Sequence, residues 1–250
     1  MPAAEDNVVE AARALAAAAP GPAHRINPAL VALLLALAVA SPLSHAAAKP
    51  APAPAANTKV PAGAYTLDKA HSSLIFRVNH LGFSHFTLRF TRLDAQLQFD
   101  PDNLAAAKVT VTIDPSSIET HYPEPAKIDF DAHLRGEEWL NTAKFAEINF
   151  HSTKVEPTGR NTMRINGELE LHGVTRPDTL EAKYNGGYAG HPLDPQARIG
   201  FSAHAAIKRS DFGIAYGLPA PGTTMGVFDP VEVVIEAEFN GPHWSGADQK

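Results

Sequence analysis

The chain has 250 residues, no cysteine and a formal net charge of −6. The absence of cysteine excludes a disulfide framework and thiolate chemistry. The mildly acidic balance argues against a nucleic-acid partner, which needs a basic stripe, and no run of like charge is long enough for a polybasic membrane patch.

The N-terminal part has the pattern of a secretory signal. An apolar run extends from Ala29 to Ala40, with Arg25 before it and small residues at 44–46 after it. A helix that crosses a bilayer takes about 20 apolar residues, so this run is too short. We therefore interpret residues 1–46 as a signal peptide whose removal leaves no stable membrane insertion. A buried apolar helix or an uncleaved anchor is the alternative.

A segment rich in proline and alanine follows at residues 47–63. Such a composition cannot bury a core and favours extended chain, so the segment is predicted to be a linker. The folded domain is predicted over residues 64–240, a length that suits one domain with a substantial core. Residues 241–250 are predicted to be a disordered tail.

Strict alternation of apolar and polar residues dominates the predicted domain. A period of two is the geometry of a half-buried strand. Strands of this kind, spread over nearly the whole domain, must share one interior. The alternation is clearest at residues 74–80, 163–171, 197–207 and 231–239.

The predicted strand at residues 86–100 changes parity midway: Phe86 and Phe90 lie on one face, and Leu93 begins the second series. Such a change is typical of a β-bulge or a barrel corner, which we expect near Thr91 and Arg92.

Residues 123–145 break the alternation, because apolar residues such as Leu134 and Trp139 fit helical spacing better. One or two short helices are predicted there, across a barrel opening or flank.

About eight antiparallel strands result from this assignment. The predicted fold class is all-β, an eight-stranded antiparallel barrel with a short helical segment. A closed barrel of this size can hold one small ligand. A two-sheet sandwich would give a similar alternation and is the alternative.

Several motifs together resemble the YceI-like family, in the family's order and over about residues 65–239. The motifs are Asp68-Lys69-Ala70-His71-Ser72, Ile118-Glu119-Thr120, Asp131-Ala132-His133-Leu134, Lys144 to Phe150, Gly167 to Thr175, and Ser210-Asp211-Phe212-Gly213. The resemblance implies a lipocalin-like β-barrel that is exported to the bacterial periplasm or beyond. It also implies a lumen that binds a long amphiphile: a polyisoprenoid, an isoprenoid quinone or a fatty-acid derivative.

Four positions depart from the family's pattern. Leu88 and Ala95 stand where glycine is usual, Phe130 replaces a common arginine and Ala146 a common proline. None breaks the strand pattern, so they concern the length and shape of the pocket.

The candidate ligand-binding residues are inward-facing and almost all apolar, and Gly167, Ala203 and Ala205 on the same faces leave room. His80 ends an inward row, where its imidazole could hydrogen-bond a ligand headgroup. The predicted set is Leu74, Phe76, Val78, His80, Phe90, Leu97, Val111, Ile113, Phe150, Leu169, Leu171, Phe201, Phe212 and Val233.

The function predicted from these residues is to bind, and to carry or store, a long amphiphilic lipid. We expect no catalytic residue, no metal and no cofactor, because the sequence has neither a His-Glu-x-x-His nor a Gly-x-Ser-x-Gly motif. A homodimer is compatible with this interpretation. Two alternatives stay open: a quinone-linked redox accessory or enzyme with His71 or His80 as proton donor, and a structural barrel with a filled core.

Overall fold

The computed structural model describes residues 60–243. The predicted signal peptide and most of the predicted linker lie outside this range. The described elements are β1 (Gly63–Leu67), β2 (Ser73–His80), β3 (Ser84–Phe90), β4 (Leu93–Phe99), η2 (Leu104–Ala106), β5 (Lys108–Ile113), η3 (Pro115–Ser117), β6 (Ile118–Glu119), α3 (Phe130–Arg135), β7 (Ile148–Pro157), β8 (Thr162–Leu171), β9 (Val174–Tyr188), β10 (Gln196–Lys208), η4 (Arg209–Phe212) and β11 (Val227–His243).

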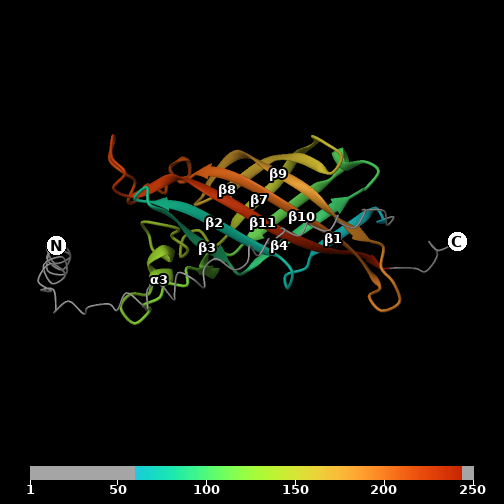
Figure 1. The fold of residues 1–250 in the computed structure, drawn as a ribbon, viewed down its shortest axis with the longest axis horizontal. Coiled ribbons are helices and arrows are strands. Elements are labelled where there is room, and N and C mark those ends of the chain that lie inside the picture. Colours follow the sequence, from blue (N-terminus) through green and yellow to red (C-terminus); the bar gives the residue numbers. More distant parts are fainter. Residues whose placement is uncertain (1–59, 244–250) are drawn as a thin grey trace, which may run out of the picture. The chain divides into compact units, whose positions relative to one another are not determined.

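Eight strands close into a ring. Their order is β1-β4-β5-β7-β8-β9-β10-β11, and β11 pairs back to β1. β2, β3 and β6 continue β1, β4 and β5 beyond an interruption in each, so that β2 pairs with β11, β3 with β2 and β6 with β3. All these pairings are antiparallel, which confirms the predicted eight-stranded antiparallel barrel (Figure 1).

The predicted corner is confirmed at Thr91 and Arg92, where β3 ends and β4 begins. The hydroxyl of Ser117 accepts hydrogen bonds from the backbone N–H groups of Thr91 (3.2 Å) and Arg92 (3.0 Å) and donates one to the carbonyl of Asp114 (2.6 Å). Ser117 is buried, so these bonds satisfy polar groups that water does not reach. One serine thus fixes the bend in two neighbouring strands.

An aromatic cluster fills the barrel at the end formed by β1 and β4. Tyr65 is fully buried, and its hydroxyl donates to the carbonyl of Pro61 at 2.6 Å. Its ring meets Phe99 edge-on at 6.1 Å, and Phe99 meets Phe201 edge-on at 5.7 Å. Edge-to-face packing of this kind is favourable beyond the burial itself, and we call this half of the barrel, with its packed core, the solid half.

The folded domain is longer than predicted at both ends. Val60, which the sequence places in the linker, is buried against the aromatic cluster. β11 continues to His243, past the boundary predicted at Asn240. A Cβ atom on Gly241 would lie 2.0 Å from the Tyr65 ring, so glycine allows the strand to pass over the buried tyrosine. Residues 244–250 of the predicted tail lie outside the described residues.

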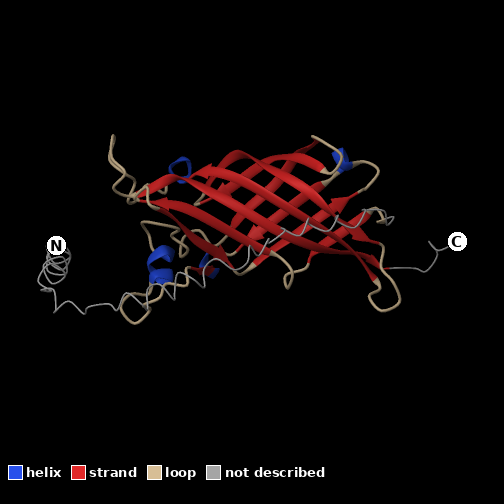
Figure 2. Ribbon diagram, in the orientation of Figure 1, coloured by secondary structure: helices blue, strands red, loops and turns tan. Residues whose placement is uncertain are grey.

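The predicted short helix is present as α3, which Figure 2 shows beside the strands. The Asp129 carboxylate caps it by accepting from the N–H of Ala132 at 2.8 Å. Asp131 accepts from both the N–H (2.9 Å) and the hydroxyl (2.6 Å) of Thr120, which ties the helix to the end of β6. Within residues 60–243, no helix has the length and apolar character needed to cross a membrane.

Candidate lipid-binding cavity

The barrel is hollow in the half that contains β2, β3, β6 and α3. A cavity of about 410 Å³ lies there, within the usual size range of small-molecule sites. Its wall is built from Leu74, Phe76, Val78, His80, Phe86, Leu88, Phe90, Val111, Ile113, Ile118, Tyr122, Phe130, Leu134, Trp139, Leu140, Ile148, Phe150, Leu169, Leu171, Asp178, Leu180, Ala205, Ile207, Arg209, Ile214, Val227, Val231, Val233 and Ile235. Almost every one of these side chains is apolar, so the cavity can solvate a hydrocarbon but offers few partners to water.

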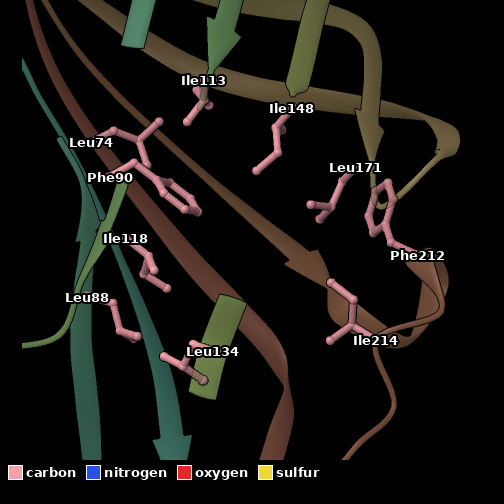
Figure 3. Close-up of a cluster of buried hydrophobic side chains, with 10 residues drawn as sticks. All are labelled: Leu74, Leu88, Phe90, Ile113, Ile118, Leu134, Ile148, Leu171, Phe212 and Ile214. Carbon is pink, nitrogen blue, oxygen red and sulfur yellow. The ribbon is translucent and has the colours of Figure 1, made fainter. Parts of the chain in front are cut away.

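The pleat of the strands places these side chains. Alternate residues of β2 face the cavity, and Leu74 and Phe76 lie opposite Ile235 and Val233 of β11. Phe76 stacks on Phe90 of β3 with ring centroids 4.9 Å apart. Figure 3 shows side chains from several strands that converge on one interior.

The segment between β6 and β7 completes the wall. Leu134 of α3 is buried in the same cluster as Leu88 and Ile118 (Figure 3). Phe130 meets Phe86 edge-on at 5.7 Å, and Trp139 also lines the cavity. The apolar residues of this segment were predicted to be helical but not assigned to the cavity. The helical spacing of these apolar residues was the only signal in the sequence. It does not indicate which side of the helix faces the barrel.

Leu88 and Phe130 depart from the family's usual glycine and arginine, and both line the cavity. At these two positions the wall therefore consists of an aromatic ring and a leucine side chain.

The predicted small residues have different roles. Ala205 lines the cavity and leaves room, as expected. Ala203 packs against a separate cluster of Val155, Met163 and Ala182. A Cβ atom on Gly167 would lie 2.4 Å from Cζ of Phe150, so the aromatic ring already fills that space.

Most of the predicted ligand-binding residues lie on the cavity wall; Leu97, Phe201 and Phe212 do not. Leu97 and Phe201 face inward at the other end of the barrel and pack in the aromatic cluster. Phe212 is buried beside Leu171 (Figure 3), and its carbonyl is 3.1 Å from Nδ1 of His172. These three residues therefore lie off the cavity wall, and strand parity alone did not distinguish them from the residues that line it.

Arg209 is the one cation among the lining residues, and it is almost fully buried. Its guanidinium donates only to backbone carbonyls, those of Ile214, Tyr216, Val227 and Phe228, at 2.7–3.1 Å. Its Cζ also lies 5.3 Å from the centre of the Trp139 ring. Burial lowers the pKa of Arg209 from its ordinary value. The residue therefore holds the connection between η4 and β11 against the cavity wall.

Asp178 is the only acidic group among the lining residues and lies opposite Gly167 of β8. Burial raises the pKa of its carboxyl above the ordinary value of 3.8, while a backbone hydrogen bond from Thr179 acts the other way. Desolvation disfavours the carboxylate, so the folded state binds this proton more tightly than the unfolded state does.

This proton linkage predicts the behaviour of Asp178→Asn. The contribution of the protonated carboxyl to stability is complete below the ordinary pKa of 3.8 and is lost as the pH rises through the raised pKa of the folded state. The amide variant has no such loss. We expect it to be more stable than the parent near neutral pH in urea unfolding, with the difference vanishing in acid. Equal stability of the two proteins at neutral pH would contradict a desolvated carboxylate.

The histidines of the family-like motifs lie at three separate places. His80 lines the cavity at its end, on an exposed part of β2. His133 accepts a hydrogen bond from Nε1 of Trp139 at 3.1 Å. His71 lies 3.0 Å from the Asp68 carboxylate and does not line the cavity. Of these three histidines, only His80 lies on the cavity wall.

Asp68, His71 and Glu238 bring ligand atoms within 4.8 Å of one another, close enough to share a cation. The Arg198 guanidinium already pairs with both carboxylates of this cluster, because its Nη1 lies 2.7 Å from Asp68 and 4.0 Å from Glu238. The hydrogen bonds from His71 and Arg198 lower the pKa of Asp68 to about 2. The arrangement is an ion-pair network around the interruption between β1 and β2.

A closed eight-stranded antiparallel barrel with an apolar cavity in one half defines a lipocalin-like barrel. The model of the YceI-like domain matches residues 65–239, and the chain belongs to this family.

Known proteins similar to this chain agree with that assignment. A UPF0312 protein of Shewanella oneidensis is 39% identical over 163 residues, which cover 64% of this chain and 81% of that protein. The crystal structure of the Campylobacter jejuni YCEI protein is 30% identical, with a TM-score of 0.54, and the match covers 71% of this chain and 98% of that one. The crystal structure of Burkholderia cenocepacia BcnA, at 22% identity and a TM-score of 0.57, shares the fold over 69% of this chain and 98% of its own.

Proposed function

We propose that this protein binds a long amphiphilic lipid in the cavity and carries or stores it without chemical change. The ligand class is a polyisoprenoid, an isoprenoid quinone or a fatty-acid derivative. The observation that carries the proposal is the cavity of about 410 Å³, walled by apolar side chains, in a barrel whose other half is solid. Membership of the YceI-like family supports it.

The energetics favour a hydrocarbon tail as the occupant. Each methylene removed from water contributes about 0.8 kcal/mol, so a dozen buried carbons contribute about 10 kcal/mol, which is of the same size as the costs of association. The polar head of such a ligand belongs near His80, the lining residue on the exposed end of β2. A carrier of this kind needs no metal and no covalent step. We further propose that it works after export to the periplasm, with residues 1–46 as the signal.

Native mass spectrometry of the protein purified from its source tests the proposal. A lipid of several hundred daltons, retained in the folded protein and released on denaturation, is the expected result. Trp139 provides a second measurement because it lines the cavity. The chain has two tryptophans, so Trp244→Phe leaves Trp139 as the single reporter. A protein that retains no lipid and shows no change in Trp139 fluorescence on addition of long-chain isoprenoids would refute lipid binding.

A further inference from the structure

The cavity end of the barrel carries two strongly exposed apolar side chains. Phe83, in the turn between β2 and β3, is 86% exposed, and Met225, in the connection from η4 to β11, is 70% exposed. The two loops are joined by a hydrogen bond from the N–H of Leu81 to the carbonyl of Gly226 at 2.9 Å. Phe83 and Met225 therefore lie on one edge of the molecule, which we call the apolar rim and define as residues 81–83 and 216–226.

The apolar rim borders the cavity. His80 and Val227 are paired in register and both line the cavity, and each adjoins one of the two rim loops. Arg209, which lines the cavity, also holds the rim loop that contains Met225. Its guanidinium donates hydrogen bonds to the carbonyls of Tyr216 and Val227 at the two ends of that loop. A surface that contacts the rim is therefore adjacent to the cavity.

The apolar rim is also free of charge. No Asp, Glu, Lys or Arg occurs from Leu81 to Leu88 or from Gly213 to Phe228. Contact of these two loops with hydrocarbon therefore requires none of their own side chains to give up a hydrated charge, which is the largest cost of entering an apolar phase. An exposed aromatic ring and a flexible methionine gain from the same transfer.

We propose that the apolar rim docks the protein on a lipid bilayer surface, so that a lipid passes between the bilayer and the cavity. This proposal rests on the proposed lipid-binding function and names its donor or acceptor. The occupant is a bilayer because the rim is contiguous with a cavity for lipid tails and has no charge with which to select a protein partner. Phe83 and Met225 are only two apolar side chains, so their contact with the bilayer is weak and reversible. Exchange of a lipid between the bilayer and the cavity requires such a contact.

The other end of the barrel provides a matched control. Leu193, in the connection between β9 and β10, is 92% exposed. It lies between His191 and Asp194, and Asp194 pairs with Arg198 at 2.8 Å. An exposed apolar side chain can therefore also be replaced by aspartate on a polar surface far along the strands from the cavity, as the two ends of the barrel in Figure 1 show.

The test compares the parent protein, the double variant Phe83→Asp/Met225→Asp and Leu193→Asp. The probe is pyrene-labelled hexadecanoic acid, presented either in phosphatidylcholine vesicles or without vesicles. We expect the double variant to lose co-sedimentation with the vesicles and to take up the probe from them about tenfold more slowly or worse, whereas its vesicle-free affinity stays within about twofold of the parent. Leu193→Asp is expected to match the parent in all three measurements.

The outcomes separate the two proposals. Uptake from vesicles by the double variant at the parental rate would overturn bilayer docking while lipid binding stands. Failure of the parent to sediment with vesicles would also overturn it and leave a protein partner as the occupant of the rim. Failure of the parent to bind any long-chain probe without vesicles would overturn the lipid-binding function itself. Both substituted side chains are exposed, and thermal unfolding checks that the variants fold as the parent does.

Discussion

Phe76→Asp is expected to reduce the affinity for a long-chain probe by about 100-fold or more, because a polar group buried without a partner costs several kcal/mol. Phe76 lies in the middle of the inward row of β2 and stacks on Phe90 across the cavity surface. An aspartate there either keeps its charge against a hydrocarbon tail or takes up a proton at a cost. Vesicle-free titration with quenching of Trp139 measures the loss.

Thr87→Asp is the control for this substitution. Thr87 lies on the neighbouring strand β3, is exposed on the outer surface and faces Arg77 of β2 in register. The substitution Thr87→Asp introduces the same charge on the same pair of strands but outside the cavity. The affinity for the long-chain probe is therefore expected to stay at the parental value. Parental affinity in Phe76→Asp would mean that the lipid binds elsewhere on the molecule.

Ala205→Phe is expected to shorten the longest tail that binds. Ala205 lines the cavity opposite Val233 of β11, and a phenyl ring there occupies space otherwise open to the ligand. Displacing about four methylenes would cost about 3 kcal/mol, or roughly a 100-fold loss of affinity for long chains. Short chains, which do not need the displaced volume, are expected to bind as before.

A series of fatty acids of increasing length, titrated into parent and variant, measures this effect. Ala206→Phe is the control, because Ala206 is the next residue of β10, is exposed and points to the other face of the sheet. Its length profile should match that of the parent. If Ala205→Phe lowered the affinity by the same factor for every chain length, the variant would have a general packing defect. That result would contradict a cavity whose size limits the length of the bound tail.

The sequence predicted the barrel correctly because alternation reports which face of a strand is buried. The change of parity after Phe90 placed the corner at Thr91 and Arg92, where β3 and β4 meet. Alternation does not report how far along the barrel a residue lies, however. Leu97 and Phe201 have the same pattern as Phe76 and Val233, yet they lie in the solid half and not in the hollow half.

The helical segment was the other part of the wall that sequence reasoning could not place. Leu134 and Trp139 were recognised as apolar residues of a helical region, but strand alternation gives no information on where a crossing segment packs. The position of α3 depends on long-range contacts, such as the two hydrogen bonds from Thr120 to Asp131. The same dependence on partners far away in the chain explains Val60, which is buried although its neighbours in sequence have the composition of a linker.

The solid half of the barrel has a consequence for how such a protein can diversify. Tyr65, Phe99 and Ile199 are buried in a cluster of their own, and none of them lines the cavity, so a substitution on the cavity wall does not remove their packing partners from this cluster. Substitutions in the hollow half can then alter the cavity while the solid half keeps its own core. A barrel organised in this way can therefore vary the shape and polarity of its cavity one side chain at a time.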